Sequence, residues 1–277
     1  MSARKSSEQS YDPAAEGTGF RTGAYRFART VMTAIVNMTM TRTWSGMDNI
    51  PKAGPVLLAV NHLGHADPAA VALFIDQAGR HPRFLAKAEL QRIRGLGYLM
   101  DATGQIAVYR ETREAGLALV NAVKRLEAGG CVVVYPEGTI TKDPDLWPMV
   151  ARTGIARLYL ATGAPVVPVS HWGTHTLRKR WRPWRRLEAK IEAGPALDLE
   201  RFHGKPPTPA LLNEITDVVV AALRAGVAKL RDEPAPPVIW DNRKKKYIAF
   251  GDSRVAADEA QAEPGDRRSP RARRKTA

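Results

Sequence analysis

The stretch Val56-Leu-Leu-Ala-Val-Asn-His-Leu-Gly-His-Ala-Asp-Pro68 carries an apolar run directly into a polar turn. Its first five residues have the length and apolar content of a buried strand, and Pro68 suits the first turn of a helix. His62 and Asp67 lie at the two ends of the turn. On one regular helix a step of five residues turns through about 500°, so these side chains would point about 140° apart. They can meet only across a turn, which the glycine between them permits.

An imidazole and a carboxylate that meet in this way form a general base and the acid that orients it. Asp67 would accept a hydrogen bond from one ring nitrogen of His62 and leave the other nitrogen able to take a proton from a hydroxyl. The structural alternative is that Asp67 simply caps the helix that follows, since aspartate is a common N-cap. The two roles are compatible. His65 is a second candidate base in the same turn.

Composition limits the class of protein. With 277 residues, 44% hydrophobic and 25% charged, the chain can form one sizeable α/β domain with appendages. A net charge of +14 indicates an anionic partner, which could be a membrane surface, a nucleic acid or a phosphorylated small molecule. The single cysteine, Cys131, excludes an intrachain disulfide and is consistent with a reducing cytosol. It lies in an apolar strand pattern, which indicates a buried small hydrophobe.

The two ends of the chain differ from its middle. Residues 1–18 and the charged, proline-rich segment 232–277 are predicted to be disordered. Residues 19–45 are predicted to form a basic amphipathic helix, with apolar side chains recurring along one face: Phe20, Ala24, Phe27, Val31, Ile35 and Met38. Such a helix either lies in the headgroup region of a membrane or packs on the domain. Neither a secretory signal nor a membrane-spanning segment is expected.

Between these ends, residues 46–231 alternate between strand and helix patterns. Besides the strand at 56–60, we expect strands over 83–87, 104–110, 131–135, 165–170 and 187–191, and helices over 68–77, 88–100, 114–128 and 209–230. This alternation predicts an α/β fold with a mixed, largely parallel central sheet flanked by helices. In such sheets ligands gather at the carboxyl ends of the strands, where His62, Lys87, Arg110 and Glu137 are all predicted to lie.

Five blocks in this order resemble the PlsC-type glycerolipid acyltransferases, which include the bacterial 1-acyl-sn-glycerol-3-phosphate acyltransferases. The blocks are Asn61-His-Leu-Gly-His-Ala-Asp67, Phe84-Leu-Ala-Lys87, Gly104-Gln-Ile-Ala-Val-Tyr-Arg110, Tyr135-Pro-Glu-Gly-Thr139 and Ala164-Pro-Val-Val-Pro168. The resemblance covers about Met47 to Gly194.

The resemblance implies a role for each block. His62 is similar to the family's general base and Asp67 to its orienting acid. Arg110, with Glu137, Gly138 and Thr139, is implied to bind the acceptor's phosphate, and Lys87 could assist as a point charge. Because an acid cannot attract phosphate, we expect Glu137 to hold Arg110 or a substrate hydroxyl. The block around Pro168 is implied to serve structure or the acyl-donor side.

Two positions depart from the family pattern. Serine often stands two residues after the histidine, where this chain has Gly64, and arginine often follows Glu-Gly-Thr, where this chain has Ile140. The first change removes a hydroxyl and the second removes a cation. Both bear on which acceptor is preferred.

The expected reaction is direct acyl transfer from acyl-CoA or acyl carrier protein to the sn-2 hydroxyl of lysophosphatidate, giving phosphatidate. No cofactor, metal or covalent intermediate is expected, because the sequence contains neither a Gly-x-Ser-x-Gly elbow nor a cluster with metal-ligand spacing. Three alternatives stay open: another acceptor, such as glycerol 3-phosphate or a different lysolipid, a thioesterase, and a basic protein that binds membranes or nucleic acid without catalysis.

The last alternative is supported by a basic segment interleaved with tryptophans, Arg178-Lys-Arg-Trp-Arg-Pro-Trp-Arg-Arg186. Tryptophan beside arginine also suits a bilayer interface, and the family blocks favour a membrane over nucleic acid. We therefore expect a peripheral or monotopic enzyme on the cytoplasmic face of the cell membrane, in contact with anionic lipid.

Overall fold

The computed structural model describes residues 23–108, 115–175 and 186–251. Seven strands form one sheet in the order β1-β7-β6-β2-β5-β3-β4. The strands are β1 (Met40–Ser45), β2 (Val56–Val60), β3 (Pro82–Lys87), β4 (Ile106–Val108), β5 (Cys131–Val134), β6 (Val166–Trp172) and β7 (Leu187–Ala193). Neighbouring strands pair in parallel except β6 and β7, which confirms the predicted mixed, largely parallel α/β sheet.

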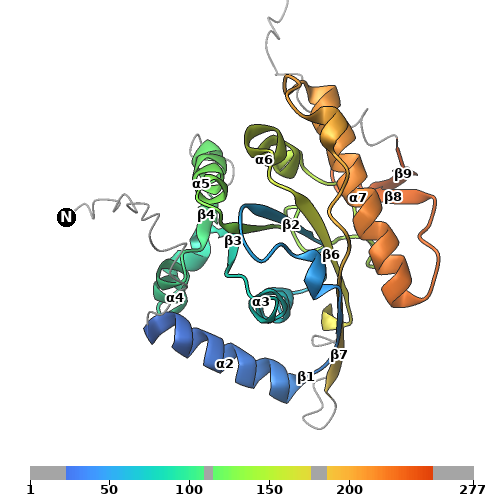
Figure 1. The fold of residues 1–277 in the computed structure, drawn as a ribbon. Coiled ribbons are helices and arrows are strands. Elements are labelled where there is room, and N and C mark those ends of the chain that lie inside the picture. The colour runs from blue at the N-terminus through green and yellow to red at the C-terminus, as the bar shows by residue number, and fades with distance from the viewer. Residues whose placement is uncertain (1–22, 109–114, 176–185, 252–277) are drawn as a thin grey trace, which may run out of the picture.

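The described helices cover both faces of this sheet (Figure 1). They are α2 (Gly23–Thr39), α3 (Asp67–Gln77), α4 (Leu96–Ala102), α5 (Ala115–Glu127), α6 (Gly154–Thr162) and α7 (Pro209–Arg231). Short 3-10 helices lie at Met47–Asn49, Ala88–Arg92 and Glu200–Phe202. None of the helices within the described ranges has the length and apolarity needed to cross a membrane.

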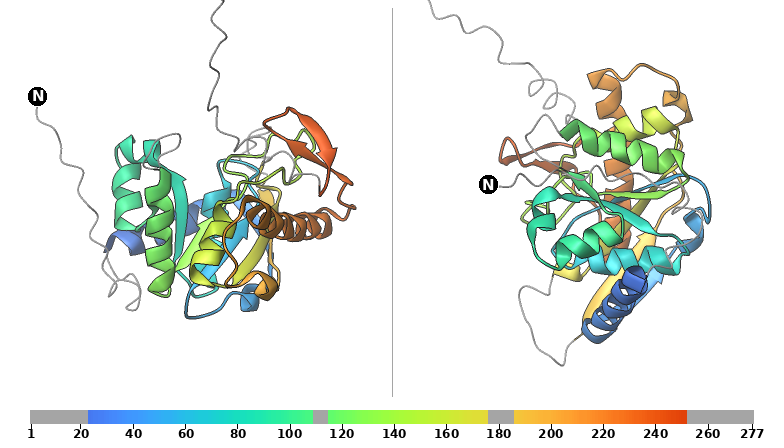
Figure 2. Two further views of the ribbon diagram at one scale, coloured as in Figure 1. Left: turned by 90° about the horizontal axis from the view of Figure 1, so that it is seen from above. Right: turned by 90° about the vertical axis from the view of Figure 1, so that its left-hand side faces the viewer.

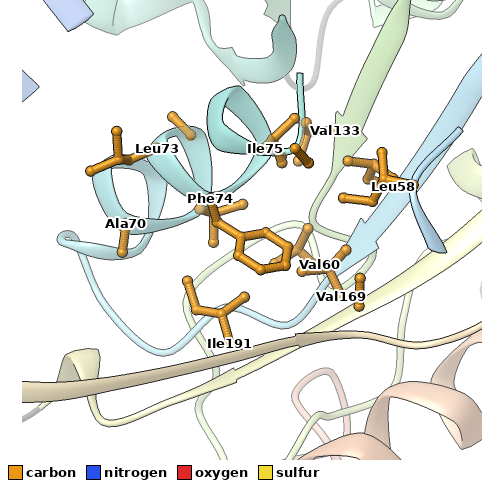
Figure 3. Packing of buried hydrophobic residues seen from close by; sticks show 14 of the residues in the cluster. Leu58, Val60, Ala70, Leu73, Phe74, Ile75, Val133, Val169 and Ile191 are labelled. Atoms are coloured by element: carbon orange, nitrogen blue, oxygen red, sulfur yellow. The ribbon is translucent and has the colours of Figure 1, made fainter. Parts of the chain in front are cut away.

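Strand β2 shows how the sequence produces this layering. All five of its residues are buried, as expected for a central strand with a helix layer on each side. Because side chains alternate along a strand, Val56, Leu58 and Val60 join the core beneath α3, whereas Leu57 and Ala59 join the core beneath α5, α6 and α7. Phe74 of α3 is fully buried and points toward Val60, Val169 and Ile191 (Figure 3).

Several predicted elements need correction. Residues 40–45 do not continue the N-terminal helix, because they form β1 and pair in parallel with β7. The helix expected over 88–100 is a 3-10 helix followed by α4, with Gly95 at a φ of 86° between them. Helix α6 was not predicted, although a parallel connection from β5 to β6 requires a crossover of this kind. Residues 1–22 and 252–277 lie outside the described residues.

The segment after α7 is also ordered, contrary to the predicted disorder of 232–277. Strands β8 (Val238–Asp241) and β9 (Lys246–Ala249) form an antiparallel hairpin beside α7 (Figure 2). Arg224 of α7 holds this segment in place, since its guanidinium donates hydrogen bonds to the backbone carbonyls of Pro148, Pro236 and Val238. The Arg224 side chain is buried, and three carbonyls depend on it.

We predict that Arg224→Ala will lower the free energy of unfolding by about 3 kcal/mol, because it leaves buried carbonyls without a donor. Arg201→Ala is the matched control, since Arg201 makes an exposed ion pair with Glu214 at 3.5 Å. Arg201→Ala should lower the free energy of unfolding by less than about 1 kcal/mol. Urea denaturation measures both values, and equal small losses would contradict the anchoring role of Arg224.

Candidate active site

The structure brings His62 and Asp67 together across the predicted turn. Strand β2 ends at Val60, and α3 begins at Asp67. The Nδ1 atom of His62 lies 2.8 Å from Oδ2 of Asp67, which confirms the contact expected from the sequence. The side chain of His62 is 16% exposed and that of Asp67 is fully buried. A base at the protein surface is thus joined to an acid in the interior.

The carboxylate of Asp67 organises the loop that carries His62. Its Oδ2 atom accepts the backbone N–H groups of Leu63 at 2.6 Å and Gly64 at 2.8 Å. Its Oδ1 atom accepts the hydroxyl of Thr174 at 2.7 Å. The N-cap position of α3 is Ala66, which makes no side-chain capping bond. The N-cap reading of Asp67 is therefore wrong, because its carboxylate turns back into the loop.

The surroundings of Asp67 keep it ionised. Burial acts to raise the pKa of this carboxyl, but His171, His62 and the Thr174 hydroxyl together hold it below its ordinary value. An ionised acceptor requires the hydrogen of neutral His62 to be on Nδ1. The Nε2 atom is then the nitrogen that can take up a proton, which is the arrangement of a general base.

The backbone and ring of His62 are fixed separately from its Nδ1 atom. Its N–H donates to Oε1 of Glu137 at 3.0 Å, and its carbonyl accepts the N–H of Thr141 at 2.8 Å. Its ring stacks on Tyr135, with 4.2 Å between ring centroids and 22° between planes. Tyr135 stacks in turn on Phe84. The imidazole therefore has little rotational freedom.

Glu137 occupies a different place from the one expected for a phosphate-binding group. It is buried, and its second oxygen accepts the backbone N–H of Met149 at 3.2 Å. Burial raises the pKa of Glu137 to about 8, although the amides of His62 and Met149 favour the ionised form. Its described contacts make it a positioning residue that joins the His62 loop to the loop after β5.

Three other predicted site residues lie near the same edge of the sheet. Lys87 is exposed at the end of β3, and Gly138 and Thr139 follow β5 as partly exposed residues of a turn. Gly138 has a left-handed φ of 70°. Arg110, two residues beyond the last described residue of β4, lies outside the described residues. Its predicted role and its contact with Glu137 stay predictions.

Three residues of the site were not predicted from the sequence: Asn61, His171 and Thr174. Asn61 and His171 exchange two hydrogen bonds between β2 and β6: the Asn61 amide donates to the His171 carbonyl, and its oxygen accepts the His171 N–H. The Nε2 atom of His171 donates to the Asn61 carbonyl at 2.6 Å and lies 3.4 Å from Asp67. Burial lowers the pKa of His171, which favours its neutral form. The available signal was the pair of polar residues His171 and Thr174 at the end of an apolar strand.

Two further sequence questions concern this turn. His65, the second candidate base, is exposed, and the structure records no contact between it and Asp67. At Gly64 a Cβ atom would lie 3.7 Å from Oδ1 of Asp67, an ordinary contact. Space alone does not explain the absence of a serine there. Within the described ranges, no cluster of three or more His, Cys, Asp or Glu residues is placed to hold a metal ion.

The match to known proteins coincides with this site. Residues 41–172 match the family model described as Acyltransferase. The matched range contains His62, Asp67, Lys87, Arg110 and Glu137.

Particular relatives narrow the class. The chain is 32% identical over 132 residues to the 1-acyl-sn-glycerol-3-phosphate acyltransferase of Borreliella burgdorferi, covering 47% of this chain and 51% of the relative. It is 28% identical over 131 residues to the chloroplastic 1-acyl-sn-glycerol-3-phosphate acyltransferase BAT2 of Brassica napus, covering 47% of this chain and 36% of the relative. The chain thus spans about half or less of the curated relatives that it matches.

A solved structure shares the fold. The crystal structure of the 1-acyl-sn-glycerophosphate acyltransferase PlsC from Thermotoga maritima matches with a TM-score of 0.56 and 23% sequence identity. The match covers 78% of this chain and 87% of that one. It extends well beyond the range of the family model, so the shared fold includes more than the motif-bearing half.

We predict that His62→Ala will lower the rate of acyl transfer by about 10²- to 10⁴-fold, the usual value of a general base. Because the His62 ring also donates to the buried carboxylate, the variant should lose about 1 kcal/mol of stability and stay folded. Asp67→Asn should lower the rate similarly and also reduce the free energy of unfolding by about 2 kcal/mol, since an amide group would face the loop N–H donors. Steady-state kinetics and urea denaturation separate the two effects. Substantial residual transfer in either variant would contradict the pair.

Proposed function

We propose that this protein transfers a fatty acyl group from acyl-CoA or acyl carrier protein to the sn-2 hydroxyl of lysophosphatidate, giving phosphatidate. The observation that carries the proposal is the 2.8 Å contact between His62 and the buried carboxylate of Asp67. It places a base with a defined tautomer at the carboxyl edge of an acyltransferase-family sheet. The acceptor is that of the two relatives named as 1-acyl-sn-glycerol-3-phosphate acyltransferases.

The geometry supports a direct transfer. His62 Nε2 takes the proton of the acceptor hydroxyl while that oxygen forms a bond to the thioester carbonyl carbon. The carbon–sulfur bond then breaks, and the imidazolium returns its proton to the leaving thiolate. Asp67 stabilises the imidazolium between these steps, because its carboxylate is ionised and fixed by three donors besides His62.

The phosphate of the acceptor belongs on the same edge of the sheet. We assign it to Arg110 with Lys87 and the turn of Gly138 and Thr139, as the motif order implies. An arginine suits a phosphate through two parallel hydrogen bonds, and a lysine adds a point charge. This group of residues favours a phosphorylated acceptor over water, and so favours acyl transfer over the thioesterase alternative.

A direct assay tests the function. Purified protein is incubated with lysophosphatidate and a labelled acyl thioester, either acyl-CoA or acyl carrier protein, and the products are separated. We expect labelled phosphatidate and a stoichiometric amount of thiol. Parallel reactions with glycerol 3-phosphate and other lysolipids test the alternative acceptors. Label released as fatty acid without any acceptor would instead indicate a thioesterase.

The structure bears on how such an enzyme would reach lipid. Helix α2 packs on α3 through buried Val36, and Arg29 forms an ion pair with Asp76 at 2.7 Å. Its predicted apolar face points the other way. Phe27 and Met38 are each 70% exposed, and Val31 and Ile35 lie exposed between them. Helix α2 thus packs on the domain and still presents an apolar stripe, which supports peripheral contact with a membrane.

The structure does not bear on whether the basic tryptophan segment binds a membrane or nucleic acid, because residues 176–185 lie outside the described residues. Membrane binding is therefore best tested at α2.

We predict that the double change Phe27→Ser and Met38→Ser will weaken binding to anionic phosphatidylglycerol vesicles at least 10-fold. Each substitution removes about 1.5–3 kcal/mol of favourable free energy, which the apolar side chain gains when it moves from water into the membrane. The matched control is Leu117→Ser, which alters an exposed apolar residue of α5 on the other side of the sheet. Vesicle co-sedimentation measures both, with circular dichroism as the check on folding. Equal binding by the double variant and the wild type would argue against α2 as the contact.

A further inference from the structure

We infer that Arg152 is a specificity-determining residue that binds the anionic headgroup of the acceptor. The inference rests on the proposed function, which it deepens by naming a cation that none of the recognised motifs contains. Arg152 lies in the loop between β5 and α6, beside the turn that follows β5.

The turn itself supplies no positive charge. Its residues are Pro136-Glu-Gly-Thr-Ile140, and the one ionisable group among them, the Glu137 carboxyl, is buried against backbone amides. Yet this turn lies beside the base, because Glu137 accepts the backbone N–H of His62. An anionic acceptor placed over the turn therefore needs a cation from a neighbouring segment.

The loop after β5 brings such a cation back over the turn. The N–H of Arg152 donates to the Pro136 carbonyl at 2.8 Å, which fixes the backbone of the loop beside the turn. The side chain then passes over Gly138. A Cβ atom built on Gly138 would lie 3.0 Å from Nε and 3.1 Å from Cδ of Arg152. Glycine at this position thus provides both a left-handed φ of 70° and the room that the arginine occupies.

The charge of Arg152 is available to a ligand. The residue is exposed, and among the residues that the structure describes no carboxylate lies within ion-pair distance of it. Arg29 and Arg231 differ in this respect, since each pairs with a nearby acid. An ordered, unpaired guanidinium presents a planar set of donors that matches the oxygens of a phosphomonoester.

The loop is braced from outside the matched family range. Val150 donates its N–H to the carbonyl of Trp240 in the C-terminal hairpin, and Met149 donates to Glu137. Arg152 therefore emerges from a backbone held on both sides. This pre-organisation lowers the entropic cost of closing a guanidinium on a phosphate.

The first test is a comparison of two acceptors that differ only in the phosphate. A short-chain, monomeric lysophosphatidate and the corresponding monoacylglycerol are assayed with the wild type, Arg152→Ala and Arg152→Lys. We expect Arg152→Ala to raise KM for lysophosphatidate about 10- to 100-fold, with kcat within about twofold, and to leave KM for monoacylglycerol unchanged. Arg152→Lys should restore part of the lost affinity for lysophosphatidate, since lysine keeps the positive charge but lacks the parallel N–H donors of the guanidinium.

Arg157→Ala is the matched control. Arg157 is an exposed residue of α6, five positions after Arg152. Its replacement by alanine removes the same single positive charge. Its kinetic constants should equal those of the wild type. An unchanged KM for lysophosphatidate in Arg152→Ala, or an equal loss with both acceptors, would overturn the inference, the latter because it would reveal a merely structural role.

A binding measurement separates this inference from the proposed function. Isothermal titration calorimetry with sn-glycerol 3-phosphate, without any acyl donor, should show at least a 10-fold weaker Kd for Arg152→Ala than for the wild type and Arg157→Ala. If the wild type transfers no acyl group but this difference persists, the proposed reaction fails and the anion site stands. If transfer to lysophosphatidate occurs and neither KM nor Kd responds to Arg152, the inference fails and the function stands.

Discussion

The arrangement of the site depends on one buried charge. Asp67 is fully buried, and burying an ion is costly unless hydrogen bonds compensate for the lost water. Here the compensation comes from two amides of the loop, the Thr174 hydroxyl and the His62 ring. Each of these donors is needed by the acid, and each is part of the site. The same bonds that make the charge tolerable therefore set the path of the loop and the orientation of the base.

Part of this arrangement could be predicted from the sequence because it is local. The contact between His62 and Asp67 follows from a strand, a short turn and a helix start within thirteen residues. Asn61, Thr174 and His171 could not be found in this way, since they come together only when β6 pairs with β2. Their partners are about 110 positions apart, and nothing in the periodicity of either strand indicates the neighbour.

The fold shows the same division. Strongly apolar or strongly periodic segments such as β2, β5, α5 and α7 were predicted nearly to their limits. Strand β1 was missed because Met40-Thr-Arg-Thr-Trp-Ser45 is mostly polar, and its order comes from pairing with β7 at the sheet edge. The hydrogen bonds that Glu137 makes were not predicted for a related reason. A sequence shows that an acid stands in a turn, but not that the amide of Met149 will reach its second oxygen from a later loop.

The C-terminal hairpin, which lies beyond the range of the family model, is part of the structure that holds the site. The Trp240 carbonyl accepts the N–H of Val150, the preceding residue Met149 donates to Glu137, and Glu137 accepts the backbone N–H of His62. Three links thus join the last described segment to His62, although the family model stops at residue 172. Sequence changes in the hairpin are accordingly constrained by the geometry of a site about 180 positions earlier.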